Sequence, residues 1–209
     1  MPRRVLVTLC ALGLAAVLPC AAAPGPPHAA APIVMPPGST PPPPNAPPPA
    51  PPGCLPGGNG YLRARIRGAL NLDIDWRNAE LECDGGPRPD GSGIRMSFLG
   101  PRRADGRRLR MVFGVSAARE GRSGHALPTN LTVIVEGAQR LYTTRGDEHC
   151  TVDRLSQQRL HAQGTPRKYR VVARGFCVAP ATTLNNAERI LISSFDFAGH
   201  AVFGDEAIR

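Results

Sequence analysis

Charge is missing from the first part of this 209-residue chain, because no aspartate, glutamate, lysine or arginine lies between Arg4 and Arg63. This absence divides the chain into three parts. We interpret them as an export signal at 1–23, a proline-rich linker at 24–53 and a single domain at 54–209. About 155 residues are enough to build one hydrophobic core.

The sequence also lacks a hydrophobic run long enough to cross a bilayer as a helix. The apolar run 5–18 follows Arg3 and Arg4 and is typical of the central part of a signal peptide. The small residues at 21–23 offer a cleavage site directly after it. We therefore predict a periplasmic or secreted protein with no membrane-spanning segment after signal cleavage.

Lipid attachment at Cys20 is the alternative for the N-terminus. A lipoprotein signal has a small residue directly before its cysteine, and Pro19 occupies that position here. The match is therefore poor, although a lipid anchor would suit a long linker. A membrane-anchored lipoprotein remains the alternative to a periplasmic or secreted protein.

The linker is dominated by proline, with fifteen prolines among the thirty residues 24–53. Proline cannot donate to helix or sheet hydrogen bonds, and it favours the polyproline II conformation. At roughly 3.1 Å per residue the segment reaches on the order of 90 Å. We interpret it as a semi-rigid spacer, in preference to a ligand for aromatic-lined grooves.

The chain contains no Cys-x-x-Cys pair and no histidine spacing typical of zinc ligands. A redox motif and a zinc site therefore have no support. Once Cys10 and Cys20 are set aside with the signal, four cysteines remain: Cys54, Cys83, Cys150 and Cys177. An even number in an oxidising compartment predicts two disulfides.

Two alternating segments, 61–67 and 71–77, predict an antiparallel hairpin. Residues that face each other must lie on the same side of the sheet. This condition gives the facing pairs Ile66–Leu72, Ala64–Ile74, Leu62–Trp76, Arg65–Asp73 and Arg63–Asp75. Extended outward, the register brings Cys54 near Cys83, and we predict a disulfide between them.

A second hairpin is predicted around the other two cysteines. Its facing pairs are Cys150–Cys177, Val152–Gly175 and Asp153–Arg174. A long loop is expected within 156–168, which contains glycine and proline. The second predicted disulfide is Cys150–Cys177.

The rest of the domain repeats this alternation in short segments. The expected strands are 94–98 and 109–113 around Asp105-Gly106, 131–135 and 140–144 around Gly137-Ala138, and 189–197 and 199–203 at the end. Segment 117–123 is expected to form a short helical turn. About nine or ten short strands without an amphipathic helix predict an all-β, antiparallel β-sandwich, in preference to a barrel.

Lysine is nearly absent, because Lys168 is the only one. Removal of Arg3 and Arg4 with the signal leaves 23 of the 25 basic residues against 16 acidic ones, a net charge of about +7. Arginine binds phosphate and carboxylate groups in a bidentate manner, so an anionic partner is one interpretation. The other is a general preference for arginine in an Ala-, Gly- and Pro-rich chain. Nucleic acid is disfavoured because only 5% of the residues are aromatic.

No catalytic motif stands out in the sequence. Segment 121–125 approaches a nucleophile elbow, but it ends in His125 where glycine is required. Asp147 and Glu148 are a weak calcium candidate. Two carboxylates in one cleft would indicate glycoside hydrolysis, for which the candidates are Glu136, Asp147, Glu148, Asp153 and Asp196. We assign no catalytic residue, no metal and no cofactor.

Two loop-rich segments, 83–91 and 127–132, carry more polar groups than a plain scaffold needs. In the predicted hairpin, 143–145 lies across from the start of the strand that follows 127–132. A polar binding site is therefore expected among Asp84, Arg88, Asp90, Thr129, Asn130, Thr144 and Arg145. The alternative is that Asp, Gly and Pro are the ordinary residues of tight loops.

Three stretches carry a resemblance: LECDGGPRP at 81–89, together with Trp76, LPTNLT at 127–132 and RGFC at 174–177. They resemble a group of uncharacterised exported bacterial proteins. The resemblance covers about residues 60–203 and leaves out the linker. It implies export and a disulfide-bearing β fold, and it transfers no catalytic residue.

We predict an exported cell-envelope protein with a non-enzymatic binding or structural role, at an anionic glycan or lipopolysaccharide-like phosphate surface. One alternative is a periplasmic hydrolase with an acid- or His-containing cleft. The other is a protein-interaction module that uses an exposed sheet edge. Convergent carboxylates would favour the hydrolase, an arginine-lined face would favour surface binding, and an uncharged edge strand would favour partner recruitment.

Overall fold

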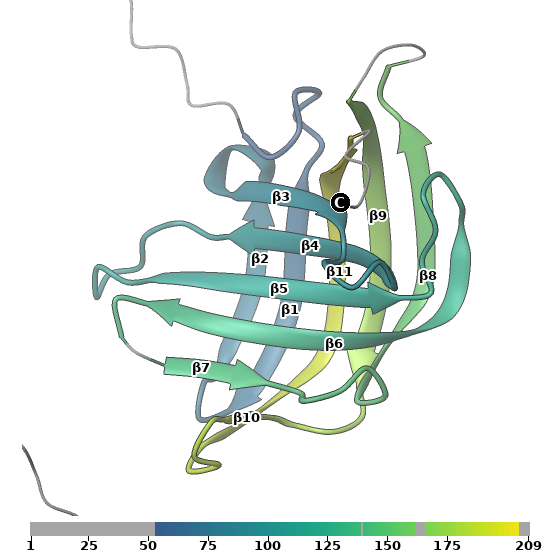
Figure 1. Ribbon diagram of the computed structural model, residues 1–209. Helices are drawn as coiled ribbons and strands as arrows, with labels where there is room; N and C mark the ends of the chain where they lie inside the picture. Colours follow the sequence, from purple (N-terminus) through teal and green to yellow (C-terminus); the bar gives the residue numbers. More distant parts are fainter. Residues whose placement is uncertain (1–52, 139, 162–165, 205–209) are drawn as a thin grey trace, which may run out of the picture. The chain divides into compact units, whose positions relative to one another are not determined.

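The computed structural model describes residues 53–138, 140–161 and 166–204 as an antiparallel β domain (Figure 1). The predicted signal, most of the linker, Cys10 and Cys20 lie outside these residues. The strands are β1 (Tyr61–Gly68), β2 (Leu72–Arg77), β3 (Glu82–Pro87), β4 (Gly93–Leu99), β5 (Arg108–Ser116), β6 (Gly124–Glu136), β7 (Arg140–Thr143), β8 (Cys150–Arg159), β9 (Arg167–Cys177), β10 (Ala181–Thr183) and β11 (Arg189–Phe203). Within the described residues the only helix is a 3₁₀ turn at Asn78–Glu80, and no helix is long and apolar enough to cross a membrane.

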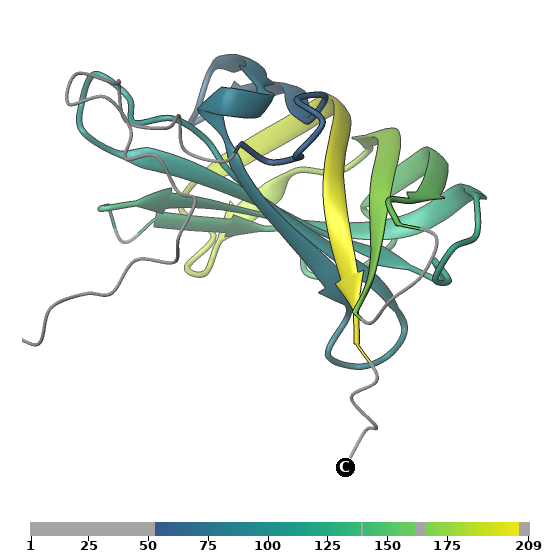
Figure 2. The ribbon, with the colours of Figure 1, turned by 90° about the horizontal axis from the view of Figure 1, so that it is seen from above.

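The strands form two layers that cross each other, which confirms the predicted sandwich (Figures 1 and 2). Hydrogen bonds join the eleven strands into one sheet, which folds over so that the front layer contains β3, β4, β5, β6 and β7 and the back layer contains β2, β1, β11, β9 and β8 (Figure 1). Strand β6 belongs to both, because its first half pairs with β8 and its second half pairs with β5 and β7. The short β10 links β7 to β11.

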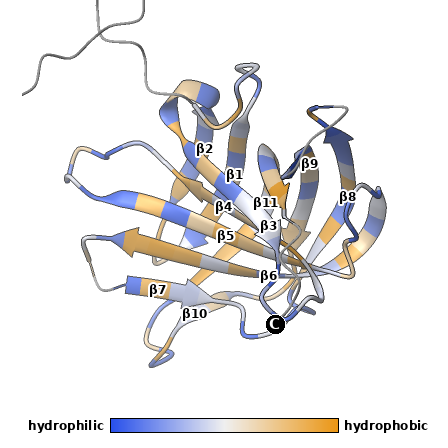
Figure 3. Cartoon of the chain, turned by 45° about the horizontal axis from the view of Figure 1, so that its top comes forward, coloured by the Kyte–Doolittle hydropathy of each residue, from blue (hydrophilic) through white to orange (hydrophobic). Residues whose placement is uncertain are grey.

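Four phenylalanine rings fill the space between the layers. Phe98 and Phe113 come from the front layer, and Phe195 and Phe197 come from β11 in the back layer. The centroid of the Phe113 ring lies 4.9 Å from those of both Phe195 and Phe197. Figure 3 shows hydrophilic and hydrophobic residues alternating along β5, and every second residue from Leu109 to Phe113 is buried. Four of the six phenylalanines in the chain are used by this cluster.

The hairpin of β1 and β2 has the predicted register at every expected pair. Its outward charges also pair as expected, with Arg63 Nε lying 3.0 Å from a carboxylate oxygen of Asp75. Arg67 joins the same ladder at 2.8 Å from Asp73. The Cys54–Cys83 disulfide is present. Cys83 lies on β3, which pairs with β4, so β3 does not extend the β1–β2 ladder.

The hairpin of β8 and β9 contains the predicted Cys150–Cys177 disulfide but corrects its register. The ladder shifts between Val152 and Arg154, so Arg154 lies opposite Arg174 where Asp153 was expected. Asp153 bulges out of the ladder and still reaches Arg174, with 3.4 Å between Nε and Oδ2. The loop expected within 156–168 is shorter than predicted, because β8 continues to Arg159 and β9 begins at Arg167.

Two further expectations are corrected. The segments 189–197 and 199–203 form one continuous strand, β11, because its first part pairs with β1 and its second part with β9. Segment 117–123 forms no helix, since Ala117 has a positive φ of 59° and a turn follows. The partners of β11 lie far away in the sequence, outside the local pattern from which the expectation of two strands came.

Candidate functional site: the Arg88–Asp147 network

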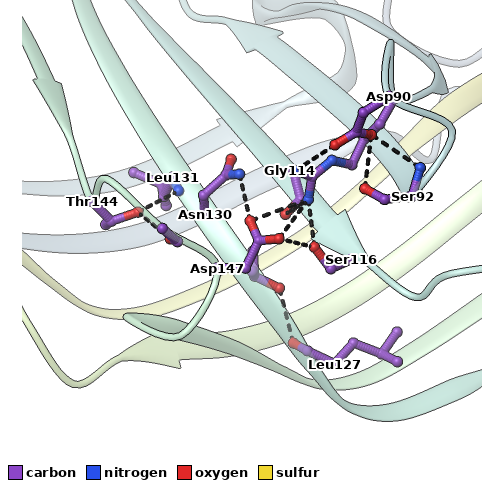
Figure 4. A network of polar contacts seen from close by, with 12 residues as sticks. Asp90, Ser92, Gly114, Ser116, Leu127, Asn130, Leu131, Thr144 and Asp147 are labelled. Carbon is purple, nitrogen blue, oxygen red and sulfur yellow. Dashed lines mark hydrogen bonds and ion pairs between the residues drawn. The ribbon is translucent and has the colours of Figure 1, made fainter.

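Four polar side chains from distant parts of the chain meet on the outer face of the front layer (Figure 4). Arg88 directly follows β3, and Ser116 ends β5. Asn130 lies in β6, and Asp147 lies in the loop between β7 and β8. We call these four residues, together with Asp90, the Arg88–Asp147 network.

The guanidinium of Arg88 is at the centre of the network. Its Nη1 donates to both carboxylate oxygens of Asp147, at 3.1 and 3.2 Å, and also to the hydroxyl of Ser116. Its Nη2 donates to Asp90 at 3.3 Å. Only 14% of the Arg88 side chain is exposed, so this guanidinium is held in one orientation.

Asp147 accepts three side-chain donors. Besides Arg88, these are Ser116 through its hydroxyl and Asn130 through Nδ2 at 2.6 Å. Burial alone would raise the pKa of the Asp147 carboxyl, but the hydrogen bonds from its partners outweigh burial and lower it. Asp147 is therefore ionised across the ordinary pH range.

Strand pairing places Asp147 where Arg88 can reach it. Thr129 of β6 faces Cys150 of β8, and the amide of Thr129 donates to the Asp147 carbonyl at 2.6 Å. Gly114 of β5 leaves room for Asn130, because a Cβ at Gly114 would lie 2.5 Å from its Oδ1. The Cys150–Cys177 disulfide follows three positions after Asp147 and secures the end of the same loop.

A hollow with a volume of about 310 Å³ opens beside the network. Its lining combines the charged groups of Arg88, Asp90 and Arg95 with Asn130 and a small apolar floor at Val112 and Gly114. The size is at the lower end of the range for small-ligand sites. Comparison with protein-family models, curated proteins and solved structures finds no match to this chain. The functional argument therefore rests on the geometry of this hollow and of the surfaces around it.

The structure brings three of the seven residues of the predicted polar site into the network. Arg88, Asp90 and Asn130 belong to the network and line the hollow. Thr129 and Thr144 are buried beneath it and support the backbone, with Thr144 Oγ1 accepting from the Leu131 amide at 3.0 Å.

Two predicted residues lie outside the network. Asp84 pairs with Arg95 at 3.0 Å, so it touches the hollow only through that arginine. Arg145 turns away and donates to the carbonyls of Thr183 and Leu184.

Ser116 was missed by sequence reasoning, and Asp147 was considered only as a calcium or acid–base candidate. The position of Asp147 depends on the pairing of β6 with β8, which joins segments about 25 residues apart and has no local turn signal. One local feature could have indicated that Asp147 is held in place, since Asp147 lies three residues before the disulfide cysteine Cys150. Ser116 carried no signal.

The positions of the candidate residues give little support to a hydrolase or to a metal site. Ser123 and His125 are exposed near the start of β6, and within the described part of the chain no hydrogen bond joins them. The part of the chain that the structure describes contains no group of three His, Cys, Asp or Glu side chains placed to hold a metal ion. Asp147 and Glu148 do not point to a calcium site, because the Asp147 carboxylate is already occupied by its donors.

A second hollow, of about 450 Å³, lies between β7 and the loop that joins β10 to β11. At its base, Glu188 accepts from Arg140 at 2.9 Å and from the hydroxyl of Tyr142. Burial, followed by this hydrogen bond, raises the pKa of Tyr142 to about 12. The charges of Arg140 and Glu188 satisfy each other at the base of this hollow.

Replacement of Asp147 by asparagine should destabilise the domain at neutral pH by about 2 kcal/mol, because Arg88 keeps its buried charge and loses its main partner. The folded-state pKa of Asp147 is lowered, so its stabilisation is present above the unfolded value of about 3.9 and lost as the pH falls through the folded value. Denaturant unfolding at pH 7 and at pH 3 measures both effects.

Asp84→Asn is the matched control for this prediction. Asp84 lies 3.0 Å from Arg95, a distance similar to the 3.1 Å between Asp147 and Arg88. Both side chains of the Asp84–Arg95 pair are substantially exposed. Its loss should change the unfolding free energy by no more than about 0.5 kcal/mol. Equal losses for the two variants, or a loss for Asp147→Asn that does not shrink in acid, would contradict the assignment.

Proposed function

We propose that this protein is an exported component of the cell envelope that binds a saccharide or phosphate-bearing ligand in the hollow beside the Arg88–Asp147 network. The observation that carries the proposal is the combination of an open hollow with a guanidinium fixed by several partners. A site whose polar groups are already ordered loses little conformational entropy when it binds.

The chemistry of the lining defines the class of ligand. Arg95 is 42% exposed at the rim, so its guanidinium has donors available to solvent. The Asn130 amide and the Asp90 carboxylate add neutral and negative hydrogen-bonding groups. No aromatic ring lines the hollow, so recognition relies on hydrogen bonds and charge and not on stacking against a sugar ring.

Binding is favoured over catalysis by the state of Asp147. General acid catalysis in glycoside hydrolysis needs a carboxyl with a raised pKa, whereas the pKa of Asp147 is lowered. A carboxylate of this kind is also a weak base for activating Ser116. The network is therefore suited to holding a ligand.

Recruitment of a partner strand is less well supported than ligand binding. The sheet path ends at β2 and β3. Strand β2 carries Asp73 and Asp75 on its outward face, and β3 ends in Pro87. Charge and proline on edge strands oppose the addition of another strand.

The location of the protein in the cell envelope is part of the proposed function. The disulfides Cys54–Cys83 and Cys150–Cys177 are consistent with an oxidising compartment. Together with the signal-like N-terminus, they support a periplasmic or secreted protein, with lipid attachment at Cys20 as the alternative anchor.

The test is the thermal stability of the oxidised, exported protein with neutral saccharides, acidic saccharides and phosphate-bearing glycans. A ligand that binds only the native state raises the melting temperature. We expect a rise with at least one ligand, and about tenfold weaker binding for Arg95→Ala, because a charged hydrogen bond is lost.

Arg154→Ala is the matched control, since Arg154 is exposed on the opposite layer and carries the same charge. It should leave the affinity unchanged. A flat response to every ligand would remove the hollow as a binding site. Equal losses for Arg95→Ala and Arg154→Ala would show attraction by net charge alone.

A further inference from the structure

The connection between β4 and β5 concentrates positive charge at one end of the front layer. Three of its eight residues 100–107 are arginine, and one is acidic. Figure 1 shows that this connection extends beyond the turn between β6 and β7. Figure 3 shows it as largely hydrophilic. We call Arg102, Arg103 and Arg107 the arginine tip.

The turn itself does not depend on the arginine side chains of Arg103 and Arg107. Asp105 accepts from the backbone amide of Arg107 at 3.0 Å, and the amide of Gly106 donates to the carbonyl of Arg103 at 2.9 Å. Gly106 has a φ of +78°, which glycine adopts without strain. Asp105 and Gly106 are therefore sufficient to form the turn.

The guanidinium groups of the arginine tip lack acidic partners. Arg108 pairs with Glu82 at 2.8 Å and is thereby neutralised. Across the ranges that the structure describes, no carboxylate lies within ion-pair distance of Arg102, Arg103 or Arg107. Arg102 instead donates to the Gly106 carbonyl at 2.7 Å, which fixes its direction.

Three unpaired like charges on one turn repel each other and contribute nothing to the core. They become favourable only when an anion lies against them. Arginine recognises phosphate through paired N–H donors, and it is less strongly hydrated than lysine. The shape of the tip favours a surface over a soluble polymer as the anionic partner. A protruding turn meets a flat charged surface more readily than it encloses a single polymer chain.

We propose that the arginine tip docks the domain on the phosphate groups of an anionic lipid surface. The inference rests on the envelope location in the proposed function but not on the ligand of the hollow. No large apolar side chain is present at 101–107, so the contact is electrostatic and reversible, without insertion into the hydrocarbon.

The experiment is sedimentation of the oxidised, exported protein with vesicles of phosphatidylcholine alone or with added phosphatidylglycerol. We expect binding only to the anionic vesicles, and weaker binding as salt is added. The triple variant Arg102→Ala, Arg103→Ala, Arg107→Ala should lose about fivefold in affinity for each arginine, hence on the order of a hundredfold.

The matched control is the triple variant Arg122→Ala, Arg154→Ala, Arg189→Ala, which removes the same charge from exposed positions without ion-pair partners in the described residues. It should lose much less. Equal losses of vesicle affinity in the two triple variants would overturn the assignment to the tip, because net charge alone would then explain the binding. If the protein does not bind vesicles and instead binds a soluble acidic polysaccharide through the tip, the proposal that the tip docks on a lipid surface is overturned.

Arg95→Ala separates this inference from the proposed function. It should bind vesicles as the unchanged protein does, because Arg95 lies in the hollow and outside the tip. Vesicle binding that is lost in Arg95→Ala but retained in the tip variant would place the anion site in the hollow and overturn the inference. Failure of the saccharide panel alone leaves the vesicle result intact.

Discussion

Phe113→Ala is expected to lower the free energy of unfolding by about 4 kcal/mol, the largest effect of any single substitution proposed for this protein. The ring is fully buried and touches Phe98 in its own layer as well as Phe195 and Phe197 in the other. Truncation leaves a cavity where the two layers meet, and a sheet cannot easily collapse to fill it. Denaturant unfolding with both disulfides oxidised measures the loss.

Phe176→Ala is the control for this substitution. Phe176 is 42% exposed on β9, so its removal leaves no enclosed cavity. We expect a change of no more than about 1 kcal/mol. Comparable losses at the two positions would contradict the view that the aromatic cluster holds the layers together.

The second large effect is expected from Cys150→Ala with Cys177→Ala. The disulfide closes a segment with a sequence separation of 27 residues. The chain-entropy model gives about 3–4 kcal/mol for a loop of this length. Cys54 and Cys83 have a separation of 29, so the same model predicts a nearly equal loss when that bond is removed.

The two disulfides should differ in their coupling to Asp147. Cys150 ends the loop that carries Asp147, whereas Cys54 lies before β1 and Cys83 lies in β3. The destabilisation caused by Asp147→Asn should therefore shrink when the Cys150–Cys177 bond is absent and stay the same when the Cys54–Cys83 bond is absent. A double-mutant cycle measures both values. Equal coupling in the two backgrounds would contradict a role for the nearby disulfide in positioning Asp147.

The most local features of this fold could be predicted from the sequence. In β1 and β2 the apolar alternation and the opposite charges both require one register, and a three-residue turn joins the strands. Both disulfide pairings were predicted correctly, although Cys54–Cys83 was placed by extending the β1–β2 register, which β3 does not follow. The bulge at Asp153 could not be predicted from the same pattern, because a bulge changes the pairing without changing the composition.

The candidate site was predicted only in part. Arg88, Asp90 and Asn130 stood out because their loops contain more polar groups than their turns require. Their central partner, Asp147, depends on the return of β8 alongside the first half of β6. Pairings between distant segments are set by the packing of the whole domain, so apart from its position three residues before Cys150 the local sequence around Asp147 did not indicate its role.

The strand that belongs to both layers also determines how the domain can come apart. β6 carries Asn130 in the front layer, and its first half is hydrogen-bonded to β8 in the back layer. The front layer therefore cannot detach while the Arg88–Asp147 network stays intact. We therefore expect the network and the folded state of the whole domain to be lost in one cooperative step, so that a partly opened form would not keep the proposed ligand site.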